Sequence, residues 1–342
     1  MVKMDNKGMK KGIVIIATLT IVLSAIAFSS VPVGAGTLTI TDDFGRTVTI
    51  HGVPERIISL SPTNTEILFA IGAGDRVVGV TEYCNYPEEA KEREKIGGVT
   101  TVSIEKVVSL QPDLVLGDEL NGKETFERLE ELGITIVGLN PENISEILDD
   151  IMLVGRITGE EKNASSLVKA MNRRIEEIKN KTSDVKRPKV AHITWHDPIW
   201  VAGSGTVQDE MIEIAGGENA FSDIKDWGTV SLEKFIDRNP EVIIVSVGHG
   251  VAEMAPYEYI LNEERLKVVD AVKNERVYTI NADIASRAGP RIVDATETVH
   301  GYLSEFRTPM PSATPETSGF EAVLAIIVLL AVVYLSGRTN RF

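Results

Sequence analysis

The chain has 342 residues, of which 43% are hydrophobic and 25% are charged, and its formal net charge at pH 7 is −15. This composition predicts more than one globular domain and excludes extended disorder except at the ends. The acidic balance argues against nucleic acid as a partner, and it indicates either a basic partner or simply a well-solvated surface.

Residues 1–35 have the pattern of a signal peptide for export. Four lysines precede an apolar run at residues 13–28, and small residues before Ala35 offer a cleavage site. An uncleaved membrane anchor is the alternative, because the apolar run is slightly long for a signal peptide. The single cysteine, Cys84, lies far from this segment, so we expect neither an internal disulfide nor an N-terminal lipid-bearing cysteine.

The middle of the chain reads as two similar lobes. Residues 36–54 alternate apolar and polar positions around a glycine turn, which predicts a β-hairpin. Residues 55–158 alternate short apolar strands with helical stretches, and residues 183–306 repeat this pattern. Residues 159–182 keep one apolar face at helical spacing, which predicts a long connecting helix. We therefore expect an α/β fold in which two Rossmann-like lobes with parallel sheets are joined by a single backbone helix.

A short internal repeat supports the two-lobed reading. In both lobes the order Ser-x-Glu-Lys, apolar helical turn, proline and β-branched run recurs, at residues 102–116 and 230–244. The repeat places Glu105 and Glu233 at equivalent positions. A glutamate at a helix start also has a purely structural explanation, because it stabilises the helix dipole.

The C-terminal end has the pattern of a membrane attachment. Residues 307–319 form a stalk rich in Pro, Thr and Ser, and residues 320–342 form an apolar segment followed by arginines. The trailing arginines give the orientation expected of an exported protein with its tail in the membrane. The tail resembles archaeal sorting signals, in which Pro-Gly-Phe precedes an apolar segment that is exchanged for a lipid. Here Ser318-Gly319-Phe320 occupies that position, and the tail is either retained or exchanged.

Motifs of catalysis and of metal binding are absent from the sequence. Gly72-Ala73-Gly74 lacks the context of a phosphate loop, and no clustered Cys/His pair has the spacing of a zinc site. We therefore expect no enzymatic activity and no resident cofactor or metal. The competing class is a chelatase-like or metallocluster enzyme on similar lobes. Exported chains can carry glycans, and the sequons are Asn143, Asn163 and Asn180.

Five motifs carry a resemblance to a known family. They are RIISLSPTNTE at 56–66, VGVTEY at 78–83, YP at 86–87, GGENAF at 216–221 and RAGPRI at 287–292. With these motifs the chain resembles the helical-hinge substrate-binding proteins of ABC importers, which take up cobalamin, ferric siderophores and haem. The resemblance covers about residues 38–306. It implies a ligand cleft between two lobes, joined by one helix that limits their closure.

The resemblance also implies partners and site residues. Glu105 and Glu233 match the positions that pair with arginines of the permease in this family. Tyr83 and Trp227 match aromatic positions that contact corrinoid in cobalamin-binding relatives, and His196 and His249 follow strand ends, where loops face a cleft. The residues that we expect to contact ligand are Tyr83, Tyr86, Trp195, His196, Trp227, His249 and Arg287.

A corrinoid is the favoured ligand, with a ferric siderophore or haem as alternatives. Cobalamin binders carry a further tryptophan where this chain has residues 99–102, and Arg287 would suit an anionic siderophore. The alternative hypothesis for Trp195 and Trp200 is that they are core residues near strand ends. We thus expect a monomeric carrier on the outer face of the cell membrane, with an ABC permease and its ATPase as partners. A surface adhesion or sensor module is a third class that would keep the fold.

Overall fold

The computed structural model of the chain describes residues 36–183, 185–248 and 254–306. The predicted signal peptide 1–35, stalk 307–319 and tail 320–342 lie outside the described residues, as does His249. Within the three described ranges, every helix is too short or too polar to cross a membrane.

The N-terminal lobe is a parallel sheet with the strand order β5-β4-β3-β6-β7, flanked by a β1–β2 antiparallel hairpin. Ser61 begins its first helix, because the hydroxyl accepts a hydrogen bond from the Asn64 N–H and Pro62 fits the first turn. The elements are β1 (Thr37–Thr41), β2 (Thr47–His51), β3 (Ile57–Ser59), α2 (Pro62–Ala70), β4 (Val77–Val80), β5 (Glu94–Lys95), α3 (Ile104–Ser109), β6 (Leu114–Gly117), α4 (Lys123–Glu131), β7 (Ile136–Gly138) and α5 (Ile144–Thr158).

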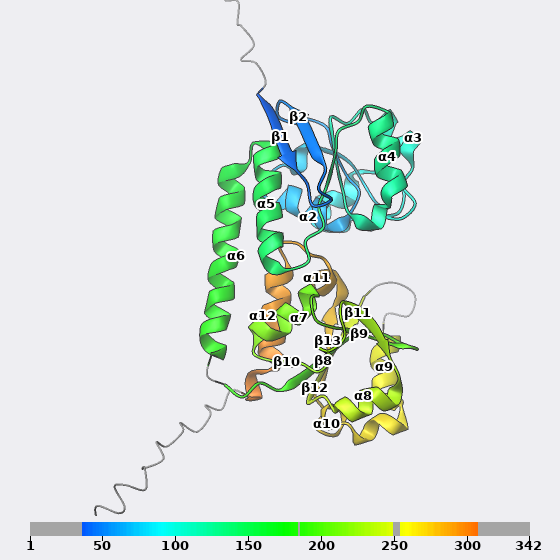
Figure 1. The fold of residues 1–342 in the computed structure, drawn as a ribbon, viewed down its shortest axis with the longest axis vertical. Helices are drawn as coiled ribbons and strands as arrows, with labels where there is room; N and C mark the ends of the chain where they lie inside the picture. The colour runs from blue at the N-terminus through cyan, green and yellow to red at the C-terminus, as the bar shows by residue number, and fades with distance from the viewer. Residues whose placement is uncertain (1–35, 184, 249–253, 307–342) are drawn as a thin grey trace, which may run out of the picture.

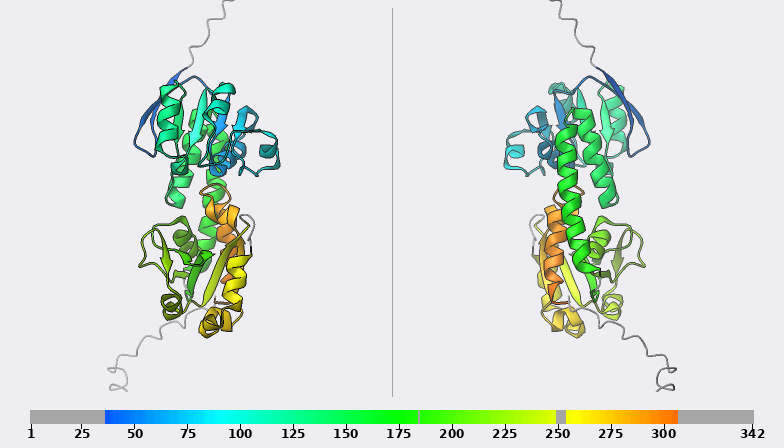
Figure 2. Two further views of the ribbon diagram at one scale, coloured as in Figure 1. Left: turned by 90° about the vertical axis from the view of Figure 1, so that its right-hand side faces the viewer. Right: turned by 90° about the vertical axis from the view of Figure 1, so that its left-hand side faces the viewer.

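One long helix, α6 (Glu161–Thr182), connects the lobes. Gly159 ends α5 in the left-handed conformation, which lets the chain turn back into α6. The apolar face of α6 is buried against α5 in the first lobe and against α7 and α12 in the second. Figure 1 and Figure 2 show α6 running along one side of both lobes, as the helical spacing of its apolar residues predicts.

The C-terminal lobe holds a mixed sheet with the order β11-β9-β8-β12-β13, to which β10 adds beside β8. Strands β8, β10, β12 and β13 are parallel, whereas β9 and β11 are antiparallel to their neighbours. The elements are β8 (Lys189–His196), β9 (Ile199–Ala202), α7 (Val207–Ala215), β10 (Glu218–Asn219), β11 (Trp227–Val230), α8 (Leu232–Arg238), β12 (Val242–Val247), α9 (Ala255–Asn262), α10 (Asp270–Lys273), β13 (Val277–Asn281), α11 (Ala282–Ser286) and α12 (Ile292–Tyr302).

The α/β class and the two lobes with parallel sheets are confirmed, and the second sheet carries two further strands, β9 and β11, that pair antiparallel. Only Asp197 and Pro198 separate β8 from β9. A connection of two residues can form an antiparallel hairpin, but a parallel crossover needs a dozen residues or more.

A single hydrophobic cluster runs through both lobes. It contains Leu116 of the first sheet, Ile151 of α5, Met171 and Ile175 of α6, and Ile244 of the second sheet, all buried. Two smaller clusters fill the far faces of the two sheets. Because α6 shares its apolar side with both lobes, bending the molecule at this helix would disturb a continuous core, which favours a stiff connection.

Candidate functional site

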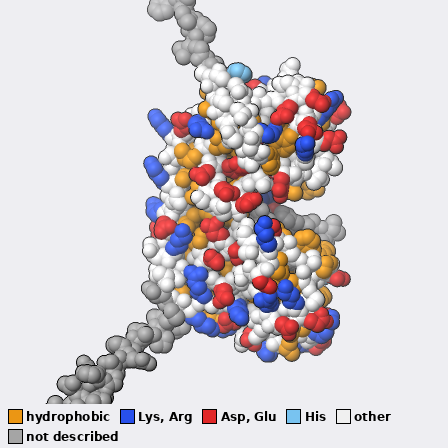
Figure 3. Space-filling view, viewed as in Figure 1, with side chains coloured by type: hydrophobic (Ala, Val, Ile, Leu, Met, Phe, Trp, Pro, Cys, Tyr) orange, Lys and Arg blue, Asp and Glu red, His pale blue; other side chains and the backbone are white. Residues whose placement is uncertain are grey.

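A cavity of about 600 Å³ lies between the lobes. Its walls come from loops that follow the carboxyl ends of β3, β6 and β7 in the first lobe, and from the loops around β9, β11 and α11 in the second. Ligand sites of parallel α/β sheets form at this end of the strands. Figure 3 shows the molecule hollowed between the lobes, with acidic side chains along the rims.

A groove of about 690 Å³ between α5 and α6 is slightly larger than this cavity. It lies along α5 of the first lobe and along the connecting helix α6, and it is open to solvent. Charged and hydroxyl side chains dominate its lining, among them Arg156, Lys162 and Lys169. We take the interlobe cavity as the candidate site, because it has walls from both lobes and lies at the strand ends.

Trp227 is the aromatic residue of the predicted set that lines the interlobe cavity. It opens β11 and is partly buried, with its ring centroid 6.0 Å from that of His192. His192 is fully buried and its Nε2 lies 2.9 Å from the Ser246 hydroxyl. Burial lowers the pKa of His192 to about 4, so the imidazole beside Trp227 is neutral at pH 7.

The other predicted aromatic residues lie on the surface of the two lobes. Tyr83 is 62% exposed and Tyr86 is 47% exposed. Trp195 and Trp200 face each other across the β8–β9 hairpin and are 44% and 41% exposed, so the reading of these two as core residues is wrong.

His196 ends β8 within a small aromatic group. Its ring centroid lies 4.8 Å from that of Trp195 and 5.2 Å from that of Tyr259 on α9. Its Nδ1 is buried and has no hydrogen-bond partner among the residues that the structure describes. The structure therefore brings Trp195 and His196 together but leaves both outside the lining of the interlobe cavity.

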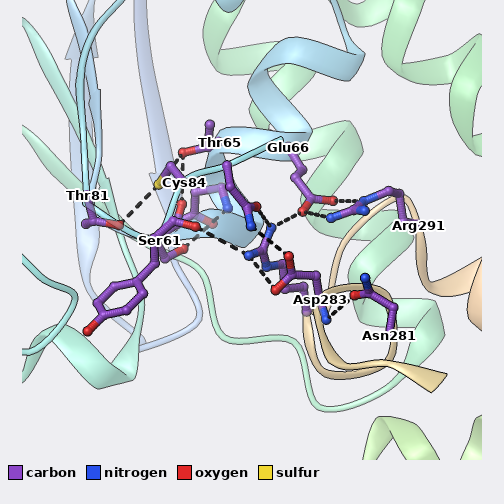
Figure 4. A network of polar contacts seen from close by, with 12 residues as sticks. Ser61, Thr65, Glu66, Thr81, Cys84, Asn281, Asp283 and Arg291 are labelled. Carbon is purple, nitrogen blue, oxygen red and sulfur yellow. Dashed lines mark hydrogen bonds and ion pairs between the residues drawn. The ribbon is translucent and has the colours of Figure 1, made fainter. Parts of the chain in front are cut away.

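Arg287 lies in an ion-pair network that joins the lobes. Its Nη1 donates to Oε1 of Glu66 at 2.8 Å, and Arg291 donates to both oxygens of the same carboxylate. Glu66 is only 2% exposed, and it comes from α2 of the first lobe. Figure 4 shows Glu66 facing Arg291 across this junction. The Arg287 charge is thus already balanced by carboxylates of the protein.

The network extends to the neighbouring loops. Arg287 Nη2 lies 2.8 Å from Oδ1 of Asp283, and the Asn85 amide donates to Oδ2 of Asp283 at 2.8 Å. The guanidinium of Arg291 lies 4.0 Å from the centroid of the Tyr86 ring, within range of a cation–π interaction. We call Glu66, Asn85, Asp283, Arg287 and Arg291 the interlobe clamp. Sequence reasoning missed Glu66 and Arg291, although both lie in motifs that carry the family resemblance.

The cavity itself is acidic. Asp118, Glu119 and Glu142 line it from the first lobe and Asp226 from the second, and none of the described lining residues is Lys, Arg or His. Burial raises the pKa of Asp118 above its usual range. The protein therefore offers a ligand carboxylates and an aromatic face in this cavity.

The two Ser-x-Glu repeats adopt the same local structure. Ser103 and Ser231 are the N-caps of α3 and α8, and each accepts a hydrogen bond from a backbone N–H of its helix. Glu105 and Glu233 follow within the first turn and are exposed. Hydrogen bonds from its own backbone N–H and from Ser231 lower the pKa of Glu233. In Figure 1, α3 and α8 lie on the edge of the molecule away from α6, one in each lobe.

The three glycosylation sequons differ in their surroundings. The Asn143 side chain caps α5, and the Asn163 amide donates to the Ile71 carbonyl and to Glu160. Asn180 is exposed on α6. Use of these sites stays a prediction. In the described part of the chain, no group of three His, Cys, Asp or Glu residues is arranged to hold a metal ion.

Comparison with known proteins gives two family matches. A model described as periplasmic binding protein matches residues 57–284, and a model described as the PGF-CTERM motif matches residues 317–338. YvrC of Bacillus subtilis, an uncharacterized ABC transporter substrate-binding lipoprotein, is 34% identical over 268 residues, which are 76% of this chain and 83% of that protein.

Solved structures share the fold. The periplasmic vitamin B12 binding protein BtuF of Vibrio cholerae aligns with a TM-score of 0.66 and 29% identity, over 75% of this chain and 98% of that one. The apo form of the periplasmic heme-binding protein RhuT from Roseiflexus sp. RS-1 aligns with a TM-score of 0.67 and 28% identity, over 74% and 99% of the two chains.

Proposed function

Because the chain belongs to the periplasmic binding protein family, we propose that it captures a metal chelate outside the cell and delivers it to the permease of an ABC importer. A corrinoid is the favoured chelate, and a ferric siderophore or haem is the alternative. Family membership confirms the resemblance that the five motifs carry. The matched sorting motif confirms a surface protein that is anchored at its C-terminus.

The observation that carries the proposal is the interlobe cavity with Trp227 in its wall. Its volume of about 600 Å³ lies within the range of small-molecule sites, which is about 300 to 1,000 Å³. An aromatic wall suits the large face of a chelate, because ring contacts add to the burial of apolar area. The vitamin B12 and heme relatives support a bulky chelate as the ligand class.

Titration of the purified protein tests the proposal. We expect cyanocobalamin to quench tryptophan fluorescence at saturation, and Trp227→Phe to remove most of the quenching. Haem and a ferric hydroxamate serve as the competing ligands. Because α6 and the shared core join the lobes, we expect little change in the small-angle scattering radius on binding. Absence of binding by every chelate would overturn the proposal.

Two exposed glutamates support a docking role toward the permease. Glu105 and Glu233 are exposed in the first turns of α3 and α8, which lie in different lobes on one edge of the molecule (Figure 1), so arginines of a partner can reach their carboxylates. We propose that they contact the permease and not the ligand, since neither lines the interlobe cavity.

An enzyme is the competing class. The relatives compared above are named as binding proteins, which supports a carrier. A carrier returns its ligand unchanged. Mass spectrometry of the chelate released from the protein by denaturation separates the two classes, because an enzyme of the chelatase type would alter the metal content of the ligand.

A further inference from the structure

We propose that the interlobe cavity selects its ligand by charge and by hydrogen-bond polarity. It takes a chelate that is neutral or cationic and carries N–H donors at its edge, such as amide or ammonium groups, and it disfavours chelates with carboxylates there. This inference rests on the proposed function and narrows the ligand class of the same site.

The first observation is the charge of the lining. Asp118, Glu119 and Glu142 stand on one wall, and Asp226 stands on the other. No described lining residue carries a positive charge. A ligand carboxylate placed between these walls would meet like charges in a partly desolvated space, where Coulomb repulsion is stronger than in water.

The second observation is a buried acceptor without a donor. Asn64 lines the cavity and is 1% exposed. Its Nδ2 donates to the Gly117 carbonyl at 3.2 Å, which fixes the amide, whereas its Oδ1 has no hydrogen-bond partner among the described residues. A buried acceptor that is left unpaired is destabilising, and an N–H group of the ligand would satisfy it.

The third observation concerns the basic residues beside the lining. Lys225 Nζ lies 3.9 Å from Oδ2 of Asp226, and both side chains are exposed, so this ion pair is weak. Arg287 and Arg291 are both paired with Glu66, and Arg287 also with Asp283. Two guanidinium groups thus meet two carboxylates within the interlobe clamp. The clamp leaves no surplus positive charge for an anionic ligand, so it does not offset the acidic cavity.

Trp227 favours the same ligand class. The face of an indole ring attracts cations and tolerates neutral flat groups, because its quadrupole is negative on the face. Leu120 adds a half-exposed apolar surface on the opposite lobe. Trp227 and Leu120 thus give the cavity apolar surfaces for the body of a chelate, and the carboxylates and Asn64 give acceptors for its edge.

The experiment uses two ligands that differ in one group. Cyanocobalamin and its monocarboxylic acid derivative share the metal and the ring. In the derivative, one side-chain amide of cyanocobalamin has been hydrolysed to a carboxylate. With the purified full-length protein we expect the derivative to bind about tenfold more weakly at low salt and the difference to shrink at high salt. The double substitution Glu142→Gln with Asp226→Asn is expected to bring the two affinities close together.

Glu161→Gln is the matched control, because it removes one carboxylate from the groove between α5 and α6 and not from the cavity. It is expected to leave the ratio of the two affinities as in the wild type. If neither corrinoid binds, ferrioxamine B, a cationic ferric hydroxamate, and its N-succinyl derivative, which carries a carboxylate, form the second pair.

The outcomes separate the two proposals. Equal affinities within a pair that binds would overturn charge selection and leave the proposed function standing. Tighter binding of the carboxylate member would also overturn it. Failure of all four ligands and of haem to bind would overturn the proposed function together with the inference that rests on it.

Discussion

Glu66 in the first lobe accepts hydrogen bonds from Arg291 in the second through both of its carboxylate oxygens. Nε of Arg291 donates to Oε2 at 2.8 Å, and Nη2 donates to Oε1 at 2.6 Å. The two residues are 225 positions apart in the chain. A bidentate pair of this kind is directional, so it fixes the angle between α2 and the start of α12 as well as their distance.

Arg291→Ala is expected to lower the free energy of unfolding by about 1.5–3 kcal/mol, because Glu66 loses two charge-assisted hydrogen bonds and keeps only Arg287 as its ion-pair partner. Urea denaturation at neutral pH measures this. Arg174→Ala is the matched control, since Arg174 on α6 pairs with the more exposed Asp294 and Glu297. Its loss is expected to cost at most about 1 kcal/mol. Equal losses in the two variants would contradict the role given to the clamp.

A carboxyl pair beside the N-terminal hairpin predicts a dependence of stability on pH. Burial and the neighbouring Asp43 raise the pKa of Asp150 from 3.8 to about 8, so the folded protein keeps this carboxyl protonated as a donor to Asp43. Because the folded pKa is raised, the stability from Asp150 is present below pH 3.8 and is lost as pH rises toward about 8.

Asp150→Asn keeps a hydrogen-bond donor toward Asp43 at position 150, but the amide does not titrate. We expect the variant to match the wild type near the low end of this pH window and to be more stable on the order of 5 kcal/mol at its upper end. Urea denaturation across the window measures the difference. Asp149→Asn changes the exposed neighbour on α5 and is expected to show no such gain. A wild-type free energy that does not fall with rising pH would show that Asp150 is ionised.

The double substitution Glu105→Ala with Glu233→Ala is expected to leave ligand affinity unchanged and to abolish stimulation of the transporter ATPase. Both residues are exposed, so folding is not expected to change. ATPase rates of the permease complex in vesicles measure the effect. Glu131→Ala with Glu264→Ala removes two exposed charges elsewhere in the same lobes and is expected to retain stimulation. Loss of ligand binding in the first variant would place the glutamates at the ligand site.

Alanine substitution of Trp227, which lines the interlobe cavity, is expected to weaken chelate binding by several-fold to tens-fold. Ring stacking contributes about 0.5–1.5 kcal/mol beyond the burial of apolar area. Isothermal titration calorimetry measures the affinities. Phe44→Ala, which removes an exposed ring of the hairpin turn, is the control and is expected to bind normally. Normal binding in the Trp227 variant would mean that the ligand lies elsewhere.

A chain that ends at Phe306 is expected to be released from cells, whereas the full chain sediments with membranes. Phe306 is the natural end point, because its ring is buried in the C-terminal lobe and the sorting motif begins later. Fractionation of cells that express either chain measures this. Recovery of the full chain as soluble protein would contradict attachment through the tail.

The elements that a short stretch of sequence determines by itself were predictable. The apolar spacing of α6 and the Ser-x-Glu repeat each lie within a short stretch, so α6 and the positions of Glu105 and Glu233 were predictable. Strands β9 and β11 were missed, because each has only four residues and neither shows a clear alternation of buried and exposed positions.

The candidate site was harder to predict for a physical reason. The lining of the interlobe cavity is assembled from loops that are far apart in the sequence, and its acidity appears only when Asp118 and Asp226 face one space. Arg287 was expected at the ligand because it is basic and lies in a family motif. Its pairing with Glu66 depends on a contact across 221 positions, for which no local pattern exists.

The single passage of the chain through α6 sets an order of assembly. Within the described residues, every strand pairing of the first sheet lies between residues 57 and 138, and every pairing of the second lies between residues 189 and 281. Chains emerge N-terminus first, and sequence-local lobes fold as units without waiting for distant partners. The first sheet can thus form completely while the second lobe is still being synthesised. Arg287 and Arg291 arrive among the last folded residues, so the clamp closes only after both lobes exist.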